Sequence, residues 1–179
     1  IIMSNTRLEK KTTTFTGRPL TRHAFAPYGD VIEAGDTPLA INQGMGARHL
    51  ELATPALTRE GGRPAISLVD CIAEPTPVTL RLMERHPLSS QAFVPLAGQR
   101  YLVVVARAGA PPGPDDLAVF LATGDQGINY HAGVWHHPMI ALDRDCRFVE
   151  VHRGGPGANC DEHGLPVGLK VAVAAERAT

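Results

Sequence analysis

The chain has 179 residues, with 17 lysines and arginines against 18 aspartates and glutamates, so its formal net charge is −1. This length favours one globular domain, which buries roughly 70% of the surface that its unfolded chain exposes. A composition with 44% hydrophobic and 20% charged residues argues against a disordered, collagen-like or coiled-coil protein.

The net charge and the length of the longest apolar run argue against two classes of binding partner, nucleic acids and membranes. The near-neutral charge and the scattered arginines argue against a nucleic-acid-binding surface. The longest apolar run, Leu102 to Ala106, is far shorter than the ~20 residues of a membrane-spanning helix. Three cysteines at no metal-binding or redox spacing are typical of free thiols in a reducing compartment. We therefore expect a cytoplasmic protein that binds neither nucleic acid nor membrane.

Residues 1–17 are expected to form an N-terminal arm, in which the two residues before Met3 are interpreted as a cloning remnant or an earlier start. Residues 18–165 are expected to form a single domain, and residues 166–179 a C-terminal tail.

Short apolar runs follow one another along the domain, after a short helix that Thr21 is placed to cap and that ends at Phe25. Glycine and proline separate these runs, and helical periodicity is scarce, which indicates an all-β domain with minor short helices. Short antiparallel strands at this spacing predict a β-barrel or a double-sheet jelly roll. The expected strands are residues 65–72, 78–86, 91–96, 100–106, 117–122, 128–131, 134–142 and 146–152.

The strand expected over residues 78–86 ends in two polar groups on its apolar face. Strand alternation places Glu84 and His86, about 7 Å apart, on the face of Val78, Leu80 and Leu82. Inside the fold, a carboxylate and an imidazole need a divalent metal or a polar ligand to satisfy them. The alternative is a simple ion pair at the solvated mouth.

A second segment holds three of the chain's eight histidines, His131, His136 and His137. Extended backbone from Val134 onward directs only one of the two adjacent histidines to the interior. Two neutral imidazoles with one carboxylate form an open set of ligands for zinc, nickel, copper or iron. The alternatives are a histidine packed against Trp135 and a solvated pair.

These residues resemble the two cupin motifs. Glu84-x-His86, followed by Gln91 and Gly98, is similar to the first motif, with Glu in place of the first His and Gln in place of the usual Glu. His131-Ala-Gly-x-x-His136 is similar to the second motif, with His131 in place of Pro. The resemblance implies a cupin-like jelly roll or barrel. It places the metal ligands at Glu84, His86, Gln91 and His136.

A longer set of ordered segments resembles the ureidoglycolate lyase family, a cupin-like family of allantoin and purine catabolism. The resemblance implies cleavage of (S)-ureidoglycolate to glyoxylate and urea by a homodimer with a divalent metal. Nickel is the suggested ion, with zinc and manganese as alternatives. The segments are residues 28–33, 41–44, 84–93, 129–138 and 153–161.

The reaction removes a hydroxyl proton, stabilises the forming aldehyde oxygen and protonates the leaving urea nitrogen. The candidate catalytic residues are Glu84, His136 and His131, and without a metal either histidine is a candidate general base. Arg48 is a candidate for the substrate carboxylate. Asn42 and Tyr130 are further candidate substrate-binding residues. Two other functions stay open: a non-catalytic module that binds a small carboxylic acid or sugar, and an amidohydrolase that releases ammonia from the same substrate.

Overall fold

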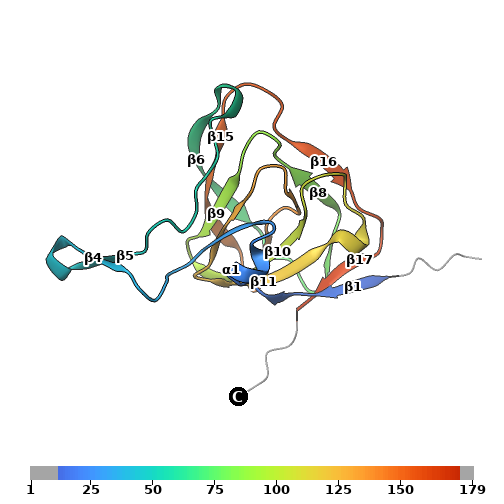
Figure 1. The fold of residues 1–179 in the computed structure, drawn as a ribbon. Coiled ribbons are helices and arrows are strands. Elements are labelled where there is room, and N and C mark those ends of the chain that lie inside the picture. The colour runs from blue at the N-terminus through green and yellow to red at the C-terminus, as the bar shows by residue number, and fades with distance from the viewer. Residues whose placement is uncertain (1–11, 174–179) are drawn as a thin grey trace, which may run out of the picture.

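The computed structural model describes residues 12–173 and confirms an all-β fold, in which the described range has one short α-helix (Figure 1). A seven-stranded sheet has the order β16 (Asp161–Gly164), β8 (Leu82–Arg85), β13 (Trp135–His136), β10 (Gly98–Ala106), β11 (Ala118–Gly124) and β2 (Arg18–Pro19), with β14 (Ile140–Ala141) also paired to β10. A five-stranded sheet has the order β3 (Gly29–Ile32), β12 (Gly127–Tyr130), β9 (Gln91–Pro95), β15 (Cys146–Gly154) and β6 (Arg63–Cys71).

The smaller elements complete the described range. A three-stranded sheet consists of β1 (Thr13–Thr16), β17 (Leu169–Ala172) and β7 (Val78–Thr79), and β4 (Leu39–Ile41) pairs with β5 (Gly46–Arg48) as a separate hairpin. The helix is α1 (Arg22–Phe25), and the 3₁₀ turns are η1 (Asn42–Gly44), η2 (Arg59–Gly61) and η3 (Pro114–Asp116). In residues 12–173 the sheets remain separate and do not close into one barrel, so the jelly-roll form of the prediction is the one observed.

Strand β10 connects two hydrophobic cores because its alternate side chains point to opposite faces of the sheet. Tyr101 and Val103 join a core that includes Phe148 of the five-stranded sheet. Leu102 joins a second core that includes Val171 of the three-stranded sheet. The seven-stranded sheet is therefore covered on both faces.

Two predicted strands are interrupted in the structure. The strand expected over residues 134–142 divides into β13 and β14. The strand expected over residues 78–86 divides into β7, which pairs with β17, and β8, which pairs with β13 and β16. Across this break the buried side chain shifts from Leu80 to Met83, not to Leu82 as expected. Glu84 therefore faces away from the core that holds Val78 and Leu80.

The predicted start of the short helix at Thr21 is confirmed. The hydrophobic core also includes residues outside the predicted domain of residues 18–165. Thr21 caps α1, since its side-chain oxygen accepts a hydrogen bond from the Ala24 amide at 3.2 Å. The segments expected to be an arm and a tail contain β1 and β17, which pair with each other, and Val171 is fully buried. Residues 1–11 and 174–179 lie outside the described residues.

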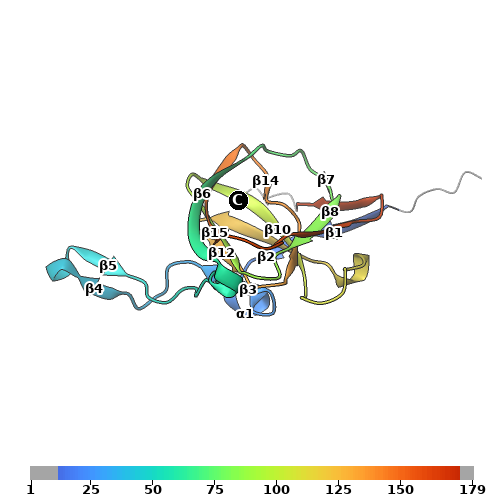
Figure 2. The same cartoon turned by 90° about the horizontal axis from the view of Figure 1, so that it is seen from above.

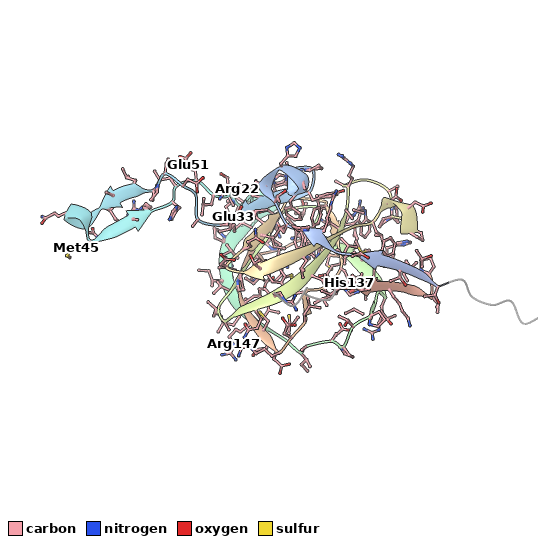
Figure 3. The ribbon with its side chains drawn as sticks, turned by 90° about the horizontal axis from the view of Figure 1, so that it is seen from below. Arg22, Glu33, Met45, Glu51, His137 and Arg147 are labelled. Atoms are coloured by element: carbon pink, nitrogen blue, oxygen red, sulfur yellow. The ribbon has the colours of Figure 1, made fainter. Side chains whose placement is uncertain are left out.

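The β4–β5 hairpin projects from the body of the molecule on the side of β6 (Figures 1 and 2). Its turn contains Asn42 and Gln43 at positive φ, and Met45 lies at its outer end (Figure 3). No residue of β4, η1 or β5 is buried. Arg22 of α1 contacts Glu33, where the chain leaves for the hairpin (Figure 3).

Two further expectations concern the membrane and the cysteines. No helix in the described part of the chain is long and apolar enough to span a membrane. Cys71, Cys146 and Cys160 are all free, although Cys71 and Cys146 are register partners on adjacent strands.

Aromatic side chains surround Phe148 in the core between the two large sheets. Phe148 is fully buried and packs edge-on against Tyr101 and Phe93, at ring-centroid distances of 5.1 and 6.1 Å. Phe148→Ala leaves a cavity in this core, so it is expected to lower the free energy of unfolding by about 3–5 kcal/mol. Denaturant-induced unfolding measures this change. Val167→Ala, at a side chain that is 74% exposed, is the control, and equal stability of the two variants would contradict the packing.

Candidate active site

Glu84 and His136 are register partners on adjacent strands β8 and β13. The pairing sets Oε1 of Glu84 3.7 Å from Nδ1 of His136. Because β13 alternates, Trp135 joins the second core while His136 turns to the opposite side, where its ring stacks on Tyr130 at a centroid distance of 4.2 Å. The imidazole is thereby fixed in orientation.

The second histidine is positioned by a backbone carbonyl. Nδ1 of His86 lies 2.6 Å from the carbonyl oxygen of Asn159. A carbonyl only accepts hydrogen bonds, so Nδ1 carries the proton and Nε2 keeps its lone pair. The Asn159 side chain fixes this loop by accepting from the Leu88 amide at 2.8 Å and donating to Ser89 Oγ at 2.9 Å. This is the outer-shell support that orients histidine ligands in metal sites.

Three buried atoms in this region have no hydrogen-bond partner in the described residues: Nε2 of His86, Nε2 of His136 and Oε1 of Gln91. Leaving a buried polar atom unpaired costs about 1–3 kcal/mol. Ligand atoms of Glu84, His86 and His136 all lie within 4.8 Å of one another. The donor set of two imidazoles and one carboxylate therefore fits a divalent metal ion.

The protonation states of His136 and Glu84 also suit the binding of a metal ion. Burial, with a smaller contribution from His86, lowers the pKa of His136 to about 3, so this imidazole is neutral near pH 7. Burial raises the pKa of Glu84, and the nearby His86 partly opposes that rise. The Glu84–His136 contact is thus not an ion pair at neutral pH. A divalent cation would favour the carboxylate form of Glu84.

A pocket of about 330 Å³ opens beside this group, a size suited to a small ligand. Arg153 lines it, is 7% exposed, and donates to the carbonyl oxygens of Arg59 and Glu60 at 3.0 Å each. Both acceptors are neutral carbonyl groups, so neither of them offsets the positive charge of the Arg153 guanidinium beside the pocket. The lining residues are His86, Ser89, Gln91, Glu150, His152, Arg153, Asn159 and Cys160.

The structure places ligand atoms of Glu84, His86 and His136 within 4.8 Å of one another, and Gln91 lines the same pocket as His86. The other predicted residues lie apart from this group. Tyr130 is buried behind His136, and its hydroxyl donates to Met139 sulfur at 3.7 Å. His131 lies about half exposed against Asp30, with Nε2 and Oδ1 3.3 Å apart, outside the ligand group.

Asn42 and Arg48 lie on the projecting hairpin, away from the pocket of their own chain (Figure 1). Sequence reasoning placed them near the substrate from their position in a loop. In the structure, Arg153 is the arginine at the pocket.

Sequence reasoning also missed Glu150 and His152, and a usable signal was present. In the predicted strand over residues 146–152, Cys146 and Phe148 share a face with these two residues. An apolar strand face that ends in polar groups is the pattern that identified Glu84 and His86.

Two large sheets that share one core and carry a group of imidazole and carboxylate side chains define an all-β jelly-roll protein with a candidate metal site. A family model described as ureidoglycolate lyase matches residues 12–172. The chain belongs to the ureidoglycolate lyase family.

Relatives of known name agree with this assignment. The chain is 48% identical to ureidoglycolate lyase of Azotobacter vinelandii, over 81% of this chain and 88% of the relative. It is 47% identical to that of Pseudomonas aeruginosa (81% and 86% covered) and 46% identical to that of Stutzerimonas stutzeri (84% and 89% covered). Among solved structures, RmlC from Streptococcus suis in complex with dTDP-D-xylose aligns with a TM-score of 0.45 and 15% identity, over 72% of this chain and 63% of that chain.

The support of His86 can be tested through metal affinity. Asn159→Ala removes the side-chain bonds that hold the loop bearing the His86 acceptor, so affinity for Ni²⁺ or Zn²⁺ is expected to fall by about 10–100-fold. Competition with a chromophoric chelator measures the affinity. Asn42→Ala, on the hairpin, is the control and should bind as the wild type does. Unchanged affinity in Asn159→Ala would show that this loop does not position a ligand.

Proposed function

We propose that this protein cleaves the C–N bond of (S)-ureidoglycolate to give glyoxylate and urea, a step of allantoin breakdown. The observation that supports this most strongly is the group of ligand atoms from Glu84, His86 and His136 within 4.8 Å of one another, beside a small pocket in a chain of this family. The reaction needs no covalent nucleophile, so Cys160 has no assigned part. Burial raises the pKa of its thiol, in keeping with an inert side chain.

We propose that Glu84, His86, Gln91 and His136 hold a divalent ion. Nickel is suggested by the resemblance of the motifs, and zinc or manganese suit the same donors. When bound, such an ion supplies Lewis-acid polarisation of the substrate's hydroxyl and carboxylate oxygens.

The chain's own residues supply binding and orientation. The buried charge of Arg153 is proposed to attract the substrate carboxylate at the pocket. The carboxylate of Glu84 is the proposed acceptor for the hydroxyl proton. Tyr130, stacked on His136, is proposed to hold that ring in place and not to contact the substrate. His131, paired with Asp30 outside the ligand group, has no role in this proposal.

We also propose that the protein is a homodimer. The large apolar side chains exposed in residues 12–173 gather on two neighbouring parts of the molecule, the hairpin and the five-stranded sheet, with Val167 the exception. A hairpin without a core of its own is marginal in water, and exposed apolar patches mark interfaces. A second copy related by a two-fold axis would cover both parts at once. The exposed side chains are Leu39, Met45, Leu50, Ile66, Leu68, Ile72 and Leu96.

The proposed location is the cytoplasm, where free thiols persist. The three free cysteines support it.

Product analysis tests the function. Wild-type protein incubated with racemic ureidoglycolate is expected to release glyoxylate and urea in equal amounts without ammonia. His136→Ala removes a ligand and is expected to lower the rate by roughly 10²- to 10⁴-fold. His23→Ala, at an exposed residue of α1, is the control. Ammonia in place of urea would identify an amidohydrolase, and ligand binding without turnover a binding module.

Light scattering coupled to size-exclusion chromatography tests the dimer. The wild type is expected to have twice the mass of the chain. Leu68→Asp introduces a charge on the exposed face of β6 and is expected to give a monomer, while Val167→Asp should leave the dimer intact. A monomeric wild type would contradict the proposal.

A further inference from the structure

Strand β15 brings a second group of polar side chains to the pocket. Cys146 and Phe148 pack in the core between the two large sheets, and Glu150 and His152 follow on the same face. Both line the pocket that His86 also lines. Nε2 of Gln91 donates to Oε1 of Glu150 at 2.7 Å, so this group adjoins the donor set.

The surroundings of His152 suit a side chain that gives and regains a proton. Its Nε2 lies 2.9 Å from Ser67 Oγ on the neighbouring strand and 4.0 Å from Oε2 of Glu150. A hydroxyl both donates and accepts, so Ser67 remains bonded to the imidazole in either protonation state. The His152 side chain is 31% exposed, which leaves a route for protons from solvent.

The other groups at the site are less suited to donate a proton. His136 is neutral near pH 7 because burial lowers its pKa to about 3. The Nδ1 proton of His86 is held by the Asn159 carbonyl. The Cys160 thiol is a weak donor, and Arg153 does not deprotonate in proteins.

We propose that Glu150 and His152 form the ureido side of the active site. Glu150 accepts hydrogen bonds from the ureido N–H groups, and protonated His152 donates to the nitrogen that leaves. The electron pair of the C–N bond passes to this nitrogen, which takes the His152 proton. The carbinol oxygen loses its proton to the Glu84 carboxylate as the O–H electron pair forms the C=O bond of glyoxylate. Glu84 then releases this proton to solvent, and solvent returns a proton to His152. This inference rests on the proposed lyase function.

Binding of two partial substrates tests the assignment of Glu150. N-carbamoylglycine carries the carboxylate and the ureido group without the reactive hydroxyl, and glycolate carries the carboxylate and the hydroxyl without the ureido group. In calorimetric titrations of the metal-loaded protein, Glu150→Gln is expected to weaken N-carbamoylglycine roughly 10- to 100-fold, since hydrogen bonds to a charged group are lost. Glycolate binding should stay within about twofold. Equal weakening of both compounds, or of neither, would overturn the assignment.

Kinetics test the role of His152. His152→Gln is expected to lower kcat by roughly 10²- to 10⁴-fold while KM changes little. Metal content should equal that of the wild type, and added imidazole should partly restore turnover in His152→Ala. His23→Gln is the matched control on the surface of α1. Activity near that of the wild type, a change confined to KM, or loss of metal along with activity would each refute the role.

The wild-type assay separates this inference from the function on which it rests. If the wild type releases no glyoxylate and urea, the lyase function fails. If the wild type is active and His152→Gln is equally active, only the inference fails. Ser67→Ala provides a second variant should His152→Gln not fold, and it is expected to lower kcat by a smaller factor with unchanged metal content.

Discussion

The candidate site depends on three buried polar atoms that have no hydrogen-bond partner among residues 12–173. These atoms are Nε2 of His86, Nε2 of His136 and Oε1 of Gln91, and burying each of them costs about 1–3 kcal/mol. Their other polar atoms are satisfied or held, by the Asn159 carbonyl for His86 and by Glu150 for Gln91. Because the fold meets this cost, the donor atoms are already in position before any ligand binds. Such preorganisation is what metal binding and catalysis require.

The register between paired strands places these side chains together in one candidate active site. The pairing of β8 with β13 sets Glu84 against His136, and the break between β7 and β8 turns Glu84 toward the five-stranded sheet. From that sheet, β9 contributes Gln91 and β15 contributes Glu150. The candidate site is therefore assembled where the two large sheets face each other, and it divides into a proposed metal-binding side and a proposed ureido-binding side. Ureidoglycolate has matching halves, a hydroxy acid and a urea.

Local patterns predicted much of this arrangement. Alternation and glycine or proline boundaries identified the long strands, and Thr21 marked the start of α1. The resemblance to the cupin motifs led us to expect Glu84, His86, Gln91 and His136 as ligands, and the structure places ligand atoms of Glu84, His86 and His136 within 4.8 Å of one another. Features that depend on tertiary contacts could not be predicted from these local patterns. β1 and β17 are short, and they are held by pairing with each other, by the pairing of β17 with β7 and by packing against the second core. The hairpin that carries Arg48 has no apolar alternation that would show where it points.

Turnover is proposed to require one metal ion held by Glu84, His86, Gln91 and His136. This requirement is tested by the rate of glyoxylate and urea formation by chelator-treated protein as a divalent ion is returned in steps, with bound metal determined in the same samples. We expect negligible turnover without metal and a linear rise that ends at one bound ion per chain. Full turnover by protein shown to contain no metal would contradict it.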